Sequence, residues 1–255
     1  MKTSLSAVLI LILLSGTDVL AIEPGSRERT FVRSLELFES AQTNDDYRAS
    51  ARELESLLED GYRNGAVYYN LGNACFRAGE FGRAILNYRK AKPYRPRDPS
   101  LSANLQQALA AAPGRLPESP RPWWTHVLFW TDWISFPAKA AVTCIGLSLA
   151  AMMLATGVFF RVPRLHAIST GLLVFSIAFG IDVTLTSDDV TDSHRAVITG
   201  ETVARKGTGL SYEPAFDQPL KDGAEFQILS ETPDWIFGHF EGIGDGWVRK
   251  EFACK

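Results

Sequence analysis

Two long apolar segments, separated by only four residues, constrain this chain more than any other feature of its sequence. Residues 138–160 carry a single charge, Lys139, close to their start, and residues 165–185 carry Asp182 near their end. Each segment is long enough for a helix to cross a bilayer core, which takes about 20 apolar residues. Between them, residues 161–164 read Arg-Val-Pro-Arg, and the proline ends the first helix. The sequence therefore predicts two transmembrane helices joined in a tight hairpin.

The charges that flank this hairpin predict its orientation. Cytoplasmic loops are enriched in lysine and arginine, so residues 161–164 are expected to form a cytoplasmic turn. The other flank is acidic, with aspartates at positions 188, 189 and 192. We therefore expect a two-pass protein of the cytoplasmic (inner) membrane with both soluble parts on the periplasmic, extracytoplasmic side. Asp182 is interpreted as an interfacial residue that reaches water, not as part of a proton path through a transporter.

The N-terminus has the three parts of a secretory signal. Lys2 supplies a positive start, residues 5–14 are apolar, and the Val-Leu-Ala sequence at residues 19–21 forms a small-residue cleavage site. Residues 1–21 are therefore predicted to be a signal peptide. An uncleaved membrane anchor is the alternative, and both interpretations export the segment that follows.

Residues 22–112 predict amphipathic helices, because apolar side chains recur at a spacing of three to four. The clearest unit is residues 65–98. In this unit the small residues Gly72 and Ala84 suit a close crossing of two helices, and Pro96 ends the second helix.

The order of residues in this unit resembles the tetratricopeptide repeat, whose Leu-Gly, Ala, aromatic and Pro positions recur over 34 residues. Shifting the unit back by one period gives a degenerate copy, and shifting it forward gives a closing helix. Cys75 stands where the family has a large aromatic residue. The resemblance implies all-α helical repeats with a concave, partner-binding face. On that face it places Tyr69, Asn73, Phe76 and Arg77. Ordinary exposed helix residues are the alternative for each of the four.

Residues 113–137 are predicted to connect the repeats to the membrane. Four prolines within ten residues favour a stiff, extended spacer. The stretch from Trp123 to Trp133 contains four tryptophans, which suit the bilayer interface. A tryptophan-rich hydrophobic core is the alternative for this stretch.

Residues 194–255 contain short β runs broken by glycine, proline and aspartate, which predicts a small, closed all-β barrel. The order of residues 203–207, the Asp-Gly at 222–223 and the Gly-Trp-Val at 246–248 resembles the bacterial SH3 (SH3b) family. Thr208 stands where that family has proline. The resemblance implies an aromatic groove for peptides or cell-wall components. Its candidates are Tyr212, Trp235 and Trp247, and closure of the barrel core is the alternative, which we favour for Trp247.

Several function classes find no support in the sequence. A net charge of −3 gives no basic excess for binding nucleic acid. Cys75, Cys144 and Cys254 lie far apart, and the four histidines form no cluster. We therefore expect no metal site and interpret the cysteines as packing residues. No phosphate-binding loop, catalytic carboxylate pair or nucleophile motif occurs, so neither a catalytic residue nor a cofactor is predicted.

The complete order of signal peptide, repeats, hairpin and SH3b-like domain resembles the BatE-type proteins of the aerotolerance operon. This resemblance implies a scaffold in a Bat-type stress or aerotolerance complex of the envelope. Its partners would be proteins, including von Willebrand A-domain membrane proteins near a MoxR-type ATPase. We therefore expect a multidomain interaction scaffold without enzyme activity. The alternative is an anchor or sensor that binds peptidoglycan through the SH3b-like domain.

Overall fold

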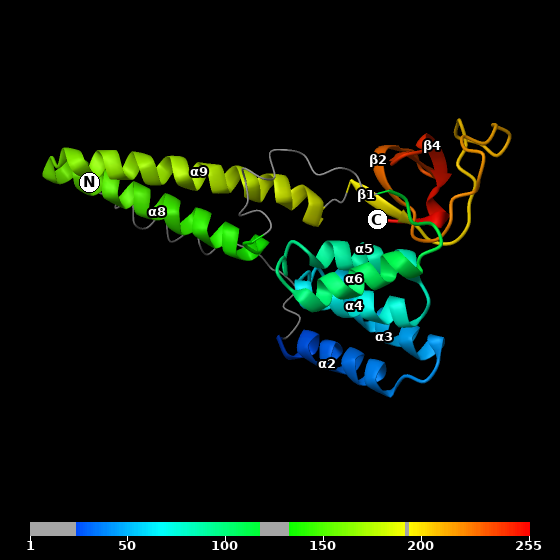
Figure 1. Cartoon of the computed structure of the whole chain (residues 1–255). Coiled ribbons are helices and arrows are strands. Elements are labelled where there is room, and N and C mark those ends of the chain that lie inside the picture. The colour runs from blue at the N-terminus through cyan, green and yellow to red at the C-terminus, as the bar shows by residue number, and fades with distance from the viewer. Residues whose placement is uncertain (1–23, 118–132, 192–193) are drawn as a thin grey trace, which may run out of the picture.

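The computed structural model describes residues 24–117, 133–191 and 194–255 (Figure 1). Within these ranges the chain forms seven α-helices and one five-stranded antiparallel sheet. The expected sequence of helices, then two long apolar helices, then a C-terminal sheet is therefore present. The predicted signal peptide and most of the tryptophan-rich stretch lie outside the described residues.

The N-terminal part, which we call the helical array, is a succession of helices in which each packs on the next. Side chains cap three of their N-termini, those that begin after Thr43, Asn64 and Asp98. Such caps satisfy backbone N–H groups that have no partner within the helix. The helices of the array are α2 (Pro24–Ser40), α3 (Asn44–Glu59), α4 (Gly65–Arg77), α5 (Phe81–Ala91) and α6 (Pro99–Ala111).

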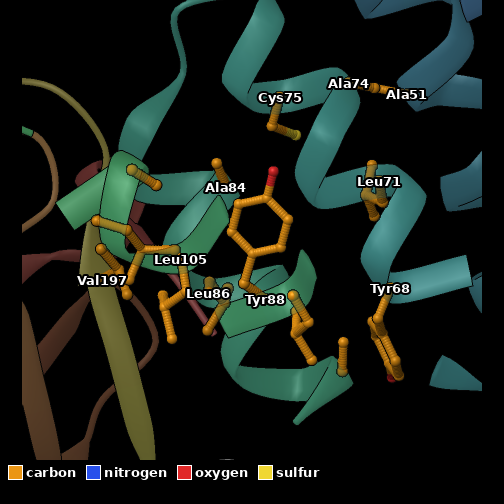
Figure 2. Packing of buried hydrophobic residues seen from close by; sticks show 14 of the residues in the cluster. Ala51, Tyr68, Leu71, Ala74, Cys75, Ala84, Leu86, Tyr88, Leu105 and Val197 are labelled. Atoms are coloured by element: carbon orange, nitrogen blue, oxygen red, sulfur yellow. The ribbon is translucent and has the colours of Figure 1, made fainter. Parts of the chain in front are cut away.

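The core of the helical array centres on the crossing of α4 and α5. Tyr88 of α5 is buried, and a Cβ atom added to Gly72 of α4 would lie 2.6 Å from its ring. Figure 2 shows the Tyr88 ring among Leu71, Ala84 and Leu105, which come from three different helices. The sequence expectation that Gly72 and Ala84 mark a close helix crossing agrees with this packing.

The two apolar helices, α8 (Phe136–Phe160) and α9 (Pro163–Thr191), lie side by side (Figure 1). Arg161 ends α8 in the left-handed conformation with φ 55°, and Pro163 begins α9. By length and composition both helices could cross a membrane. Only 17% and 22% of their most apolar windows are buried within the protein, whereas a core helix of a soluble protein is mostly buried. The apolar side chains of this hairpin therefore face outward.

Small residues let the two helices of the hairpin approach closely. A Cβ atom on Gly146 would lie 2.2 Å from the Ser176 hydroxyl oxygen, so a larger residue there would require the serine side chain to move. The hydroxyl of Ser169 donates a hydrogen bond of 2.8 Å across the interface to the backbone oxygen of Ala150. Both devices are typical of helix packing in lipid.

The C-terminal sheet has the strand order β4-β3-β2-β1-β5, so two strands remain at its edges and the predicted closed barrel is wrong. The connection from β1 to β2 runs through residues 199–224, which pair with the sheet only at isolated bridges such as Arg205 to Trp247 but pack side chains such as Leu220 into its core. Glycine, proline and serine interrupt this connection and prevent a closing strand. The strands are β1 (Arg195–Ile198), β2 (Glu225–Glu231), β3 (Trp235–Phe240), β4 (Gly244–Arg249) and β5 (Ala253–Cys254).

The sheet packs directly on the helical array, which the sequence did not predict (Figure 1). Strands β1 and β5 contact α5. Val197 of β1 belongs to the same buried cluster as the core of the array, and Cys254 of β5 packs against that cluster. Full burial of a valine side chain stabilises a fold by about 1.5–3 kcal/mol. The array and the sheet therefore share this buried cluster, and the sheet has a second core of its own.

The first residues of the expected spacer belong to this junction. The Gly114 N–H donates a 2.9 Å hydrogen bond to the backbone oxygen of Asp222. Leu116 packs against the core of the sheet, and the Pro117 ring would lie 3.2 Å from a Cβ atom on Gly242. Residues 113–117 are therefore a packed connection between the two parts, and the extended-spacer prediction does not hold for them.

Candidate interaction sites

Asn73 of the predicted concave face is committed to contacts within the helical array. Its side-chain oxygen accepts hydrogen bonds from the Tyr88 hydroxyl at 2.8 Å and from the Asn104 amide at 2.9 Å. The same Asn104 amide lies 3.1 Å from the Tyr69 hydroxyl, to which it also donates. Asn104 of α6 thus links Tyr69 and Asn73. These hydrogen bonds support a role for Asn73 in aligning α4, α5 and α6.

The other predicted residues of this face lie in different surroundings. The Arg95 guanidinium lies 4.5 Å from the centre of the half-buried Tyr69 ring. Phe76 packs edge-on against Phe81 with ring centres 5.7 Å apart. Arg77 is exposed, and it donates a 2.9 Å hydrogen bond to the Tyr47 hydroxyl. The four residues do not converge on one contact, and Arg77 is the exposed member of the set.

Strand β3 directs its aromatic side chains to opposite faces of the sheet by simple alternation. Ile236 and Phe240 are buried, whereas Trp235 and Phe237 are half-buried on the other face. Trp247 lies opposite Phe237 in β4, and their ring centres are 5.0 Å apart. Trp247 is therefore on the outward face, and our preference for it as a core residue was wrong. The register places Val248, not Trp247, in the core.

Trp235 borders an open hollow of about 400 Å³ at the end of the sheet. A neighbouring hollow of about 370 Å³ shares Leu210, Trp235 and Arg249 with the first. Volumes of this order accommodate a few side chains of a bound peptide. The first hollow is completed by Gly209, Pro233, Asp234, Lys250 and Glu251.

Of the residues that line these hollows only Trp235 was predicted from the sequence, and two predicted residues are not part of the walls. Arg249 lies directly opposite Trp235 in the β3–β4 register, and Leu210 is an exposed apolar residue of the 199–224 connection. Tyr212 and Trp247 do not line the hollows. The Tyr212 ring instead covers Gly207, where a Cβ atom would lie 2.6 Å from it. The available sequence signal for Leu210 was a lone apolar residue in the Gly-Thr-Gly-Leu-Ser stretch at residues 207–211.

The hairpin contains a buried ion pair that corrects the interpretation of Asp182. The Lys139 ammonium lies 2.9 Å from the Asp182 carboxylate, and the two side chains are only 2% and 7% exposed. Asp182 was expected to reach water, but it points into the interface between α8 and α9. Lys139 lies near the start of the first apolar segment and Asp182 near the end of the second, so an antiparallel packing of the two helices places these opposite charges at the same height. That signal was present in the sequence.

Polar contacts fix how the array and the sheet meet. The Asp222 carboxylate accepts hydrogen bonds from the Gly82 N–H at the start of α5, at 3.1 and 3.2 Å. Burial raises the pKa of Asp222, and the backbone N–H donors only partly oppose that shift. Arg89 of α5 makes two contacts of 3.1 Å with the Glu225 carboxylate of β2. Gly82 is also required for space, because its Cβ atom would lie 2.4 Å from the Ile198 oxygen.

Two cysteines lie near this junction and are held as neutral thiols. Burial raises the pKa of Cys75 to about 12. Burial likewise raises the pKa of Cys254 above its ordinary value. Because the thiolate is the reactive form, this environment suits packing residues and not nucleophiles. Among the described residues, no group of three or more His, Cys, Asp or Glu side chains is placed to hold a metal ion.

Comparison of the chain with protein-family models, with curated proteins and with solved structures gives no match.

Proposed function

We propose that this chain is a membrane-anchored scaffold of the cell envelope that binds protein partners. The observation that carries the proposal is that the helical array and the sheet, which share a buried cluster, are attached to a helical hairpin whose apolar side chains face outward. A rigid soluble body with exposed aromatic and arginine side chains, attached to a hairpin, is suited to hold other proteins at a membrane.

The direct contact between the array and the sheet supports the proposed topology. Two parts that share a core must lie on the same side of any membrane that the intervening chain crosses. That chain contains two apolar helices, and an even number of crossings returns it to its starting side. Combined with the signal-like residues 1–21 and the arginines of the turn, this supports an extracytoplasmic location for both soluble parts.

The finer assignments belong to this proposal as well. We propose that the array is a tetratricopeptide-type repeat unit and that the sheet is a divergent, open SH3b-like domain. The supporting features are the Gly72–Tyr88 crossing in the first and the order of residues 203–207 and 246–248 in the second. A BatE-type role would make von Willebrand A-domain membrane proteins the partners.

Crosslinking in intact membranes, followed by purification of the tagged full chain, tests this function. Von Willebrand A-domain proteins should be recovered with the wild-type chain. Arg77→Ala should reduce that recovery if the array binds them, and Trp235→Ala should reduce it if the sheet does. Asn73 is left unchanged, because its loss would leave the hydrogen-bonding groups of Tyr88 and Asn104 unsatisfied.

The control for these variants is Arg52→Ala, which removes an exposed arginine from α3. It should leave recovery unchanged. Equal recovery with all three variants would place the contact elsewhere on the surface. The absence of any von Willebrand A-domain protein after crosslinking of the wild-type chain would refute the BatE-type role.

The open hollow beside Trp235 and Arg249 favours a second function, binding of cell-wall peptides. Sedimentation of the purified full chain with isolated peptidoglycan measures it directly. Binding that is lost in Trp235→Ala and kept in Arg77→Ala would support this alternative. Failure of the wild-type chain to sediment would eliminate it.

A further inference from the structure

The loop between α5 and α6 touches the first turn of α8. The Phe136 N–H donates a 2.8 Å hydrogen bond to the backbone oxygen of Pro93. The rings of Tyr94 and Phe136 meet edge-on with centres 6.2 Å apart. The Arg97 guanidinium lies 4.7 Å from the ring centre of Trp133, just before the helix. Three different contacts therefore fix this loop beside the start of α8.

This contact sets the depth of the loop if α8 crosses a membrane, as the proposed function holds. The apolar stretch of α8 begins at Phe136, so the first turn lies where hydrocarbon gives way to headgroups. Trp133 is 60% exposed there, and Tyr94 packs against Phe136 in the same loop contact. Tryptophan and tyrosine are enriched at this level of a bilayer. The loop thus lies at the height of the headgroups on the side of the soluble parts.

The loop and its flanks are strongly basic in an otherwise acidic chain. Residues 89–98 contain five lysines and arginines and one aspartate, whereas the whole chain carries −3. Arg89 is paired with Glu225, and Arg95 is paired with Asp98. The Lys92 ammonium contacts the Ser102 hydroxyl at 3.2 Å, and Arg97 is exposed above Trp133. Within the described parts of the chain, no carboxylate forms an ion pair with Lys92 or Arg97.

We propose that Lys92 and Arg97, together with Trp133, form a docking surface for anionic phospholipid headgroups of the bilayer that the hairpin crosses. Arginine presents several N–H donors to phosphate oxygens, and lysine adds a compact positive charge. The indole of Trp133 fills the boundary beneath them. This surface holds the helical array against the membrane in one orientation.

The ligand class follows from charge and position together. An acidic protein could also neutralise these side chains, but the aromatic residues at the same level match the headgroup boundary of a bilayer. Each basic side chain near an anionic membrane surface contributes about a fivefold change in partitioning, or about 1 kcal/mol. Loss of both charges should therefore lower the preference for anionic lipid by about 25-fold.

The test uses the full chain reconstituted in nanodiscs made of equal parts phosphatidylcholine and phosphatidylglycerol. Lipids that remain bound after mild detergent extraction are identified by native mass spectrometry. The wild-type chain should retain phosphatidylglycerol in excess, and Lys92→Gln/Arg97→Gln should lose most of that excess. High chloride should reduce the excess by screening, and inorganic phosphate at the same ionic strength should reduce it no further.

Two further variants keep the result interpretable. Lys92→Arg/Arg97→Lys preserves the charges and should retain the excess, which excludes a simple folding defect. Arg52→Gln/Lys206→Gln removes one arginine and one lysine that are exposed on α3 and on the sheet part, and it should behave as wild type. Equal lipid ratios in the wild-type and the Gln variant would overturn this inference. Failure of the wild-type chain to enter nanodiscs at all would instead overturn the proposed membrane function on which it rests.

Discussion

The junction between the helical array and the sheet and the interface within the hairpin are stabilised by different kinds of interaction. The junction between the helical array and the sheet buries apolar side chains such as Val197, and polar contacts at Asp222 and Glu225 fix its geometry. The hairpin interface uses small residues and a single buried ion pair between Lys139 and Asp182. In water, burial of apolar surface drives association. In lipid it provides no such drive, so close packing and polar contacts must hold the helices together. The loss of a charge should therefore destabilise the hairpin far more than the junction.

The largest effect is expected in the hairpin. Asp182→Leu leaves the buried Lys139 without its counter-charge, and loss of one partner of a buried pair costs about 3–5 kcal/mol. Loss of helical circular dichroism in mixed detergent micelles measures the stability of the full chain. Lys139→Met/Asp182→Leu should recover most of the loss, because a buried pair can be replaced by apolar residues at little cost. A double variant as unstable as Asp182→Leu would show that the two charges are not coupled.

An intermediate effect is expected from steric change at the junction. Gly82→Ala places a methyl group 2.4 Å from the Ile198 oxygen, and overpacking of this kind costs about 1–3 kcal/mol. A lower midpoint of thermal unfolding and faster hydrogen exchange in β1 would measure this loss of stability. Gly25→Ala is the matched control, because a Cβ atom there meets nothing within 4 Å. It should leave stability unchanged or raise it slightly, since alanine favours helix. Equal behaviour of the two variants would contradict the observed junction.

A smaller effect is expected from the ion pair of the junction. Arg89 and Glu225 are both partly exposed, so water and salt screen their attraction. Glu225→Gln should cost no more than about 1 kcal/mol, and the difference from wild type should shrink at high salt. A loss as large as that of Asp182→Leu would mean that the junction depends on charge in the same way as the hairpin.

The smallest effect concerns pH. The pKa of Asp222 is raised by burial, so the folded chain binds this proton at a higher pH than the unfolded chain. Its contribution to stability is therefore fully present below the ordinary value of about 3.9 and is lost as pH rises through the raised folded pKa. Stability of the wild type relative to Asp222→Asn, from thermal unfolding across this window, should rise as pH falls. A constant difference would show that Asp222 does not titrate in the junction.

The features that were predictable from sequence are those encoded within one or two neighbouring elements. The lengths of the apolar segments at residues 138–160 and 165–185 predicted both long helices. The spacing of Gly72, Ala84 and Tyr88 predicted a helix crossing, because these residues lie in adjacent helices of one unit. In both cases the periodicity of the sequence contains the contact directly.

The features that were not predictable depend on register or on distant parts of the chain. The contact of Gly82 with Asp222 joins residues that are 140 positions apart. The outward position of Trp247 depends on the pairing of β3 with β4, since a shift of one residue exchanges the two faces. The open sheet depends on residues 199–224 failing to form a strand. Of the candidate sites, sequence reasoning found Trp235 but could not find Arg249 opposite it.

The shared core also has a consequence for the order in which the molecule is made. Val197 and Cys254 complete the cluster that surrounds α5, yet they follow both apolar helices in the chain. The helical array is synthesised first, but its surface on α5 stays uncovered until the C-terminal residues emerge. Contacts of such long sequence separation form slowly, and exposed apolar surface promotes aggregation meanwhile. In the topology proposed above, maturation of the first part therefore waits until the hairpin is inserted and the last strand has crossed the membrane.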